Sequence, residues 1–152
     1  MKLLVTFLVL LFSVSWFGND FTIVESTSQK YAGGREKSGY GTRYNIKLFA
    51  QKSSKKLKID QLWVGKEYFD VKPIRDPKRR NDHEFSKNDT IYLYIKHHIH
   101  TDEEMKKAQN EKKTVNPPYN YQGVALIGYK LRNKRKYKVI EKFTELKKIF
   151  YP

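Results

Sequence analysis

After residue 20 the chain alternates apolar and polar residues in short runs, and no long window repeats apolar residues at helical spacing. A period of two places alternate side chains on opposite faces of an extended strand, so each run predicts a strand with one buried face. The most regular run is Thr90–Lys96, in which Ile91, Leu93 and Ile95 share one face. Predicted strands lie at residues 21–26, 43–48, 57–64, 68–71, 90–96, 123–131 and 137–143.

Glycine-rich or polar segments separate these strands. Residues 32–41 are interpreted as a flexible glycine-rich connection, and long loops are predicted at about 72–88 and 101–118. Because the strands follow one another without crossover helices, we expect one all-β domain over residues 19–152. Its predicted architecture is an antiparallel immunoglobulin-like β-sandwich of about seven strands with Trp63 in its core, and a small β-barrel is the alternative.

The register of the last two strands can be predicted from the residues that would face each other. A three-residue connection at 132–134 pairs Tyr129 with Tyr137 and Ile127 with Val139, which gives one coherent apolar face. A two-residue connection mixes apolar and charged groups and is disfavoured. The preferred register collects four lysines on the opposite face, which we interpret as a candidate anion-binding surface: Lys130, Lys136, Lys138 and Lys142.

The first eighteen residues have the pattern of a secretory signal peptide. Lys2 is followed by the apolar run Leu3–Phe12 and then by small residues, among them Ser15 and Gly18. We therefore expect a signal-peptide helix at 1–18 and an exported product, periplasmic or extracellular. An uncleaved anchor is the alternative, but the apolar run is shorter than the roughly 20 residues that span a bilayer, so no stable transmembrane anchor is expected after cleavage.

Composition narrows the classes of function. The chain contains no cysteine, which excludes disulfides, thiolate catalysis and iron–sulfur clusters within it. Its formal net charge is +15, of which the expected leader supplies only Lys2. Such a field attracts polyanions in a salt-dependent way. Outside the cytoplasm the expected partner is an anionic envelope glycan or lipid, or another envelope protein, and intracellular nucleic acid is not expected.

Several phrases of the chain resemble those of a family. They are Ser28–Gly34, Asp60–Gly65, Pro117-Pro118-Tyr119 with Gly123–Leu126, and the closing Tyr151-Pro152. Together they resemble small exported β-rich proteins of unknown function from Gram-negative bacteria. The resemblance implies an envelope location and supplies no functional residues.

The segment His97–His100 holds three of the four histidines. In an extended strand His98 and His100 point to the same side, and imidazoles in this arrangement can bind Zn²⁺ or Cu²⁺. A complete site needs at least a third ligand, for which Asp102 and His83 are candidates. A polar strand end with no metal explains the same residues, so no cofactor is required.

No motif of a known enzyme class is present. The Gly-rich segment 33–41 leads into a strand and not into a helix, which argues against a phosphate-binding loop. The sequence thus favours a non-enzymatic binding or scaffolding module with a basic surface for an anionic partner. The alternative function is a periplasmic metal-binding protein that uses His98 and His100.

Overall fold

Strands account for all the regular secondary structure of the described residues, as the period of two predicts. The computed structural model describes residues 19–34, 39–79, 81–99 and 115–152, and the expected leader at 1–18 lies outside them. No helix in these ranges is long and apolar enough to cross a membrane. The strands are β1 (Phe21–Gly33), β2 (Tyr40–Ala50), β3 (Leu57–Val64), β4 (Glu67–Asp70), β5 (Thr90–Ile99), β6 (Ala125–Leu131), β7 (Lys134–Ile140) and β8 (Thr144–Tyr151).

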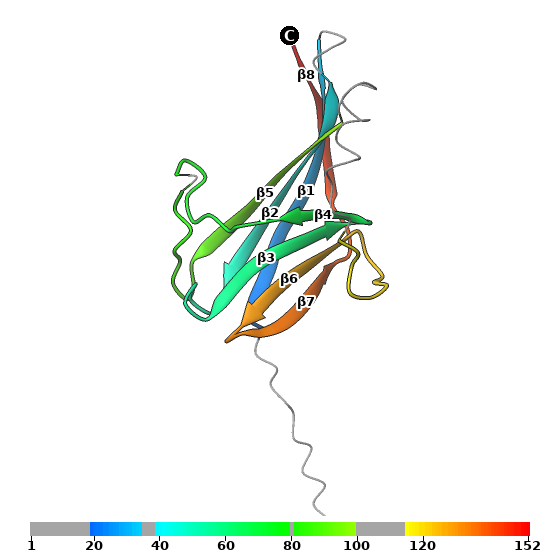
Figure 1. Cartoon of the computed structure of the whole chain (residues 1–152). Coiled ribbons are helices and arrows are strands. Elements are labelled where there is room, and N and C mark those ends of the chain that lie inside the picture. Colours follow the sequence, from blue (N-terminus) through cyan, green and yellow to red (C-terminus); the bar gives the residue numbers. More distant parts are fainter. Residues whose placement is uncertain (1–18, 35–38, 80, 100–114) are drawn as a thin grey trace, which may run out of the picture.

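The strands form two separate four-stranded sheets (Figure 1). The first, called here the long sheet, has the order β5-β2-β1-β8, and the second, the short sheet, has the order β4-β3-β6-β7. All neighbours are antiparallel except β1 and β8, which are parallel. The predicted all-β class is confirmed. The alternative small barrel is excluded, because no strand joins the two sheets.

The core lies between the two sheets where they face each other. Alternate residues of β2 and β5 point inward, and Ile46, Leu48, Ile91 and Leu93 are fully buried there. Ile127 of the short sheet belongs to the same cluster. Since a single buried leucine or isoleucine contributes about 1.5–3 kcal/mol, this interface supplies the main stabilisation of the domain.

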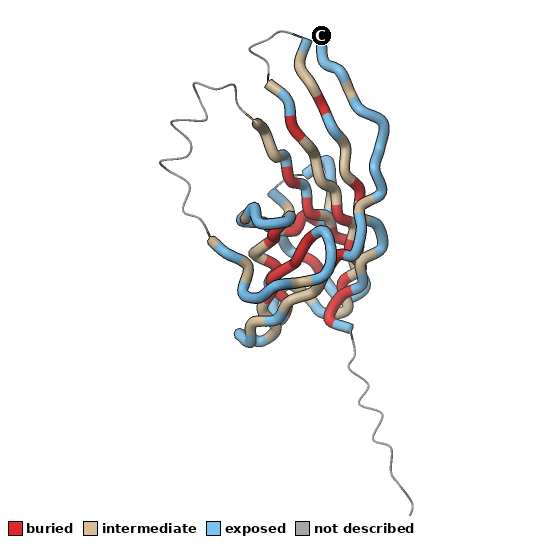
Figure 2. Tube along the Cα trace, turned by 90° about the vertical axis from the view of Figure 1, so that its right-hand side faces the viewer, coloured by how far each residue is buried: buried red, intermediate tan, exposed pale blue. Residues whose placement is uncertain are grey.

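The long sheet continues past the end of this core. β1 has 13 residues and β2 has 11, whereas no strand of the short sheet exceeds 8. The ends of β1, β2, β5 and β8 therefore stand clear of the short sheet, as both views show (Figures 1 and 2). We call this part the projection and define it as residues Lys30–Gly33, Tyr40–Thr42, His98–Ile99 and Lys147–Tyr151.

Many of the strand residues that were not predicted lie in the projection. The predicted strand at 21–26 runs on to Gly33, and β8 was not predicted at all. Seven of the eight residues of β8 are exposed, so it shows no buried face by which alternation could reveal a strand. Glycines suggested a connection at 32–41, but Gly41 lies inside β2.

The predicted register of the last hairpin is wrong. Arg132 and Asn133 both have positive φ, 47° and 67°, and form a two-residue turn of the kind that suits the twist of hairpin strands. Tyr129 consequently faces Lys136, and Lys130 faces Arg135. Lys130 is thus on the opposite face of the short sheet from Lys136 and Lys138, and the predicted four-lysine surface on one face is not formed.

The hairpin register could not be inferred from a single apolar face, because both faces of β6 are covered. Ala125–Tyr129 are all buried, so the strand has no polar face to orient it. The outer face is covered by Trp63, whose ring contacts Tyr68 and Tyr137 and whose Nε1 donates to the Val115 carbonyl at 3.0 Å. Trp63 is buried as predicted, but it lies in this outer cluster and not between the sheets.

Lys136 and Lys138 fix the start of β1 to the short sheet. Lys136 Nζ lies 3.0 Å from Asp20 Oδ2, and Lys138 Nζ donates to the Phe21 carbonyl at 2.7 Å. Tyr129 Oη donates to the same Asp20 oxygen at 3.2 Å. Burial and the Asp20 carboxylate raise the pKa of Tyr129 to about 12, while burial lowers the pKa of Lys138. Two of the four predicted anion-binding lysines thus serve structural contacts.

We expect Tyr129→Phe to reduce the loss of stability at alkaline pH. Below about pH 10 the hydroxyl is protonated in both the folded and unfolded states, and its stabilisation is fully present. Between about pH 10 and 12 only the unfolded state releases this proton, so the free energy of unfolding falls as pH rises, by about 1–1.5 kcal/mol at about pH 11. Urea unfolding of the unsubstituted protein and of the variant at about pH 8 and 11 measures this difference. An equal decline in the free energy of unfolding of the two proteins would contradict the expectation.

Candidate functional site

The two described histidines of the 97–100 segment point to opposite faces of the long sheet. His97 Nε2 lies 3.0 Å from Glu67 Oε2, and its ring contacts Phe69 of β4. His98 Nδ1 lies 2.8 Å from Tyr31 Oη on the other face. His100 and Asp102 lie outside the described residues. Within the ranges described, no group of three or more His, Asp or Glu residues can hold a metal ion, so the metal site remains a prediction.

His83, the other candidate ligand, is fixed by its own loop. The connection 71–89 folds back beside β5 through an antiparallel bridge between Ile74 and Tyr92. The His83 Nδ1 atom lies 2.9 Å from the Pro73 carbonyl oxygen. Its ring thereby lines a cleft between this connection and the long sheet.

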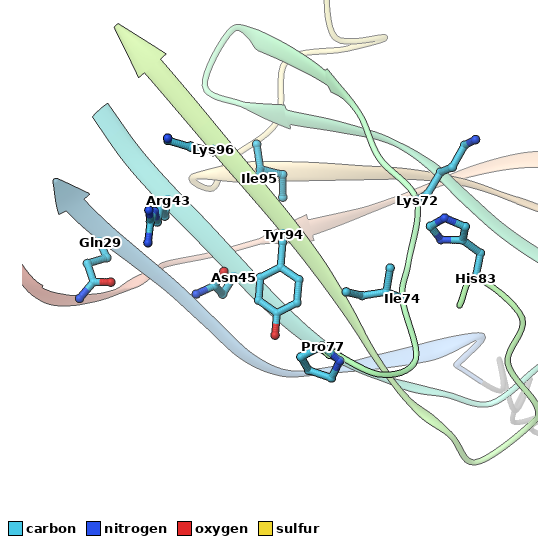
Figure 3. A pocket seen from close by; sticks show the side chains of 10 residues that line it. All are labelled: Gln29, Arg43, Asn45, Lys72, Ile74, Pro77, His83, Tyr94, Ile95 and Lys96. Carbon is cyan, nitrogen blue, oxygen red and sulfur yellow. The ribbon is translucent and has the colours of Figure 1, made fainter. Parts of the chain in front are cut away.

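This cleft is the most distinctive polar site of the described chain (Figure 3). It lies where the outer face of the long sheet, turned away from the short sheet, meets the connection 71–89, and it encloses about 610 Å³. Residues of three neighbouring strands supply the sheet side, and the connection supplies the other. The lining consists of Gln29 of β1, Arg43 and Asn45 of β2, Tyr94, Ile95 and Lys96 of β5, and Lys72, Ile74, Pro77 and His83 of the connection.

The register of the long sheet explains why these side chains meet. Arg43 lies opposite Gln29 on one side and opposite Lys96 on the other. Asn45 in the same way faces Tyr94. Directly paired residues project to the same face of a sheet, so these polar groups form two adjacent rows.

The ring of Tyr31 brings the two cations of the sheet together. Arg43 Cζ lies 5.3 Å and Lys96 Nζ 5.1 Å from its centroid, and the Arg43 guanidinium is also 5.2 Å from the Tyr151 ring. Cations over aromatic faces are held without losing their charge. Burial raises the pKa of Tyr31, while Arg43 opposes this shift, so the phenol stays neutral at physiological pH.

Gly41 makes room for this ring. A Cβ atom at position 41 would lie 2.6 Å from Tyr31 Oη and would collide with the His97 carbonyl oxygen. The Tyr31 ring crosses β2 at this point to reach His98 on β5. A glycine covered by a cross-strand aromatic residue is a known stabilising arrangement in sheets.

The electrostatic character of the cleft is uniformly positive. The cations Arg43, Lys72 and Lys96 line it together with His83, and no acidic residue is among the lining residues. Within the described part of the chain, these three cations form no ion pair. By contrast, Arg75, Arg135 and Lys136 each have a carboxylate partner. Unpaired cations beside amides and a phenol can bind an anionic ligand through charge-assisted hydrogen bonds.

The sequence analysis did not find this site. Arg43, Asn45 and Lys96 were interpreted only as the polar sides of strands, because their meeting depends on the register of β1, β2 and β5. Of the predicted lysines, Lys130 is on the outer face of the short sheet and Lys142 lies between β7 and β8, where its carbonyl accepts a hydrogen bond from Ser26 Oγ. None of the four lines the cleft.

Comparisons of the chain with protein-family models, with curated proteins and with solved structures gave no match. The function is therefore argued from the site alone.

We expect Gly41→Ala to lower the free energy of unfolding by about 2–3 kcal/mol, because the methyl group collides with the His97 carbonyl oxygen and the Tyr31 ring. It should also shift the NMR signals of the His98 imidazole. Gly65→Ala is the control: Gly65 has φ +59° and an added Cβ there meets nothing within 4 Å, so it adds backbone strain alone. Unchanged His98 signals in Gly41→Ala would contradict the assigned role of the glycine.

Proposed function

We propose that the protein is a non-enzymatic binding module that holds an acidic glycan in the cleft beside β5. The observation that carries this proposal is the set of three cations, Arg43, Lys72 and Lys96, which among the described residues have no ion-pair partner and line a cleft without an acidic side chain. Isolated surface cations are common, but here cross-strand pairing and the Tyr31 ring hold two of them on adjacent strands. Preorganised charge reduces the entropic cost of binding.

The neutral groups of the cleft favour a glycan over a simple anion. Gln29, Asn45 and the Tyr94 hydroxyl offer donors and acceptors for sugar hydroxyl groups, and Tyr94 stacks with Tyr92 at 6.0 Å. Burial raises the pKa of Tyr94, which keeps its hydroxyl protonated and able to donate. The cations then match the carboxylate, sulfate or phosphate groups of an acidic sugar.

The lining supports binding more than catalysis. A hydrolytic site needs a nucleophile beside a base, or two carboxyl groups across the scissile bond. The described residues that line the cleft include no carboxylate, serine or threonine, and the one histidine among them contacts a carbonyl of its own loop.

The proposal extends to fold family and location. We infer an immunoglobulin-like sandwich, supported by the strand orders β5-β2-β1 and β4-β3-β6-β7, with the fourth strand on the sheet of β3 and β6. We also infer export to the periplasm or cell exterior, supported by the sequence pattern of residues 1–18. A basic module there meets acidic envelope polymers.

The test substitutes the two cations that the long sheet contributes to the cleft, Arg43 and Lys96. Isothermal titration with an oligogalacturonate, and with a neutral oligosaccharide of similar length, should show binding to the acidic sugar that weakens as salt rises. In the double variant Arg43→Gln/Lys96→Gln we expect the Kd to rise at least about tenfold, equivalent to about 1.4 kcal/mol.

The matched control removes the same charge from exposed positions on the short sheet and its turn, as Lys58→Gln/Lys66→Gln. We expect less than about a threefold change in Kd, because only the long-range field is reduced. Equal weakening by both double variants would show diffuse attraction, and no binding of the acidic sugar would overturn the proposed function.

A further inference from the structure

The inner face of the projection is apolar at its outer end, and neither sheet of the described residues lies opposite it. At its outermost full row, Phe150, Ala32, Tyr40 and Ile99 are paired across all four strands of the long sheet. Phe150 is 71% exposed and Tyr40 is 54% exposed. These are among the most exposed large hydrophobic residues of the described chain, and their strand pairing places them at the end of the long sheet.

Basic residues lie directly behind this apolar row. Lys148 Nζ is 4.8 Å from the Phe150 ring centroid, and Lys30 lines the same inner face. Lys147 is exposed on β8. Glu145 also lines this face, but it lies five residues before Phe150 and therefore nearer the core. The end of the projection is thus aromatic and apolar, with a net positive zone behind it.

We propose that the projection docks on an anionic lipid bilayer, with Phe150 and Tyr40 entering the interface and the lysines contacting lipid head groups. Aromatic side chains concentrate at membrane interfaces, and basic residues near the surface bind anionic lipids. The row lies about 17 Å along β1 from Thr27, given the rise of a strand, so the aromatic residues reach an interface ahead of the sandwich. A net charge of +15 opposes a second copy as the occupant.

This proposal is independent of the glycan-binding cleft, which faces the other side of the long sheet. A variant of Phe150 leaves the cleft lining intact, so we expect the same oligogalacturonate affinity in Phe150→Ser and in the unsubstituted chain. The two proposals can therefore fail separately.

The absence of cysteine permits a direct test, because one introduced cysteine can be labelled specifically. In the full chain, Pro152→Cys places the environment-sensitive dye NBD beside Tyr151 at the end of the projection. Lys55→Cys places it in the turn after β2, at the opposite end of the sandwich. With vesicles of phosphatidylcholine and phosphatidylglycerol, we expect a blue shift and increased emission at 152 and none at 55. Phosphatidylcholine alone should give neither.

Membrane binding by residues 1–18 alone would leave the dye at 152 in water. A blue shift at 152 that is absent at 55 therefore distinguishes docking by the projection from such binding. Phe150→Ser should weaken binding to the anionic vesicles about tenfold, as measured by sedimentation, and Phe150→Leu should restore most of it. Val24→Ser, at a 55% exposed position away from the projection, is the matched control.

A dye at 152 that stays in water while the protein is bound to vesicles would overturn the proposal. So would equal effects of Phe150→Ser and Val24→Ser. A dimer in light scattering that Phe150→Ser abolishes, without vesicle binding by the projection, would assign the apolar row to a second copy instead.

Discussion

The unequal length of the two sheets is the constraint on which the rest of this structure depends. A β-sheet has two faces, and in a sandwich the partner sheet covers one of them. Here the partner ends while β1, β2, β5 and β8 continue, so the long sheet must be stabilised there by contacts among its own side chains. Tyr31 supplies much of this stabilisation from the outer face, where it is only 4% exposed. Its contacts with Arg43, Lys96, His98 and Tyr151 tie the four strands of the long sheet to one another.

The same constraint separates the chemistry of the two faces. On the outer face the side chains that surround Tyr31 are cationic, and they continue into the cleft beside the connection 71–89. On the inner face the residues beyond the core are apolar at the end and basic behind it. Side chains that alternate along one strand thus reach two different surfaces, and His97 and His98 illustrate this alternation most directly.

The sequence predicted the parts of the fold in which one strand face is buried. The run Thr90–Lys96 lies in β5, in which buried residues alternate with more exposed ones, and the all-β class followed from runs of this kind. The prediction failed where burial does not alternate. β6 is buried on both faces, so the hairpin register could not be inferred from coherent faces, and β8 is exposed on both, so it gave no signal.

The cleft could not be predicted for a further reason: Arg43 and Lys96 are 53 residues apart, and only the pairing of β2 with β5 brings them together. Of the conspicuous histidine cluster, His97 and His98 point to opposite faces, as a period of two predicts, and His100 lies outside the described residues.

The parallel pairing of β8 with β1 has a consequence for the order of folding. The last strand of the chain pairs with the first, with Ser28 opposite Glu145, so the intervening chain must be brought together before this contact forms. Such a contact carries a large loop-closure cost and forms slowly compared with the hairpins β1–β2 and β6–β7. Until it forms, the outer edge of β1 has no neighbouring strand. β1 therefore gains this neighbour only when residues 144–151 have been synthesised, and a chain truncated before β8 would expose the unpaired edge of β1 to other chains.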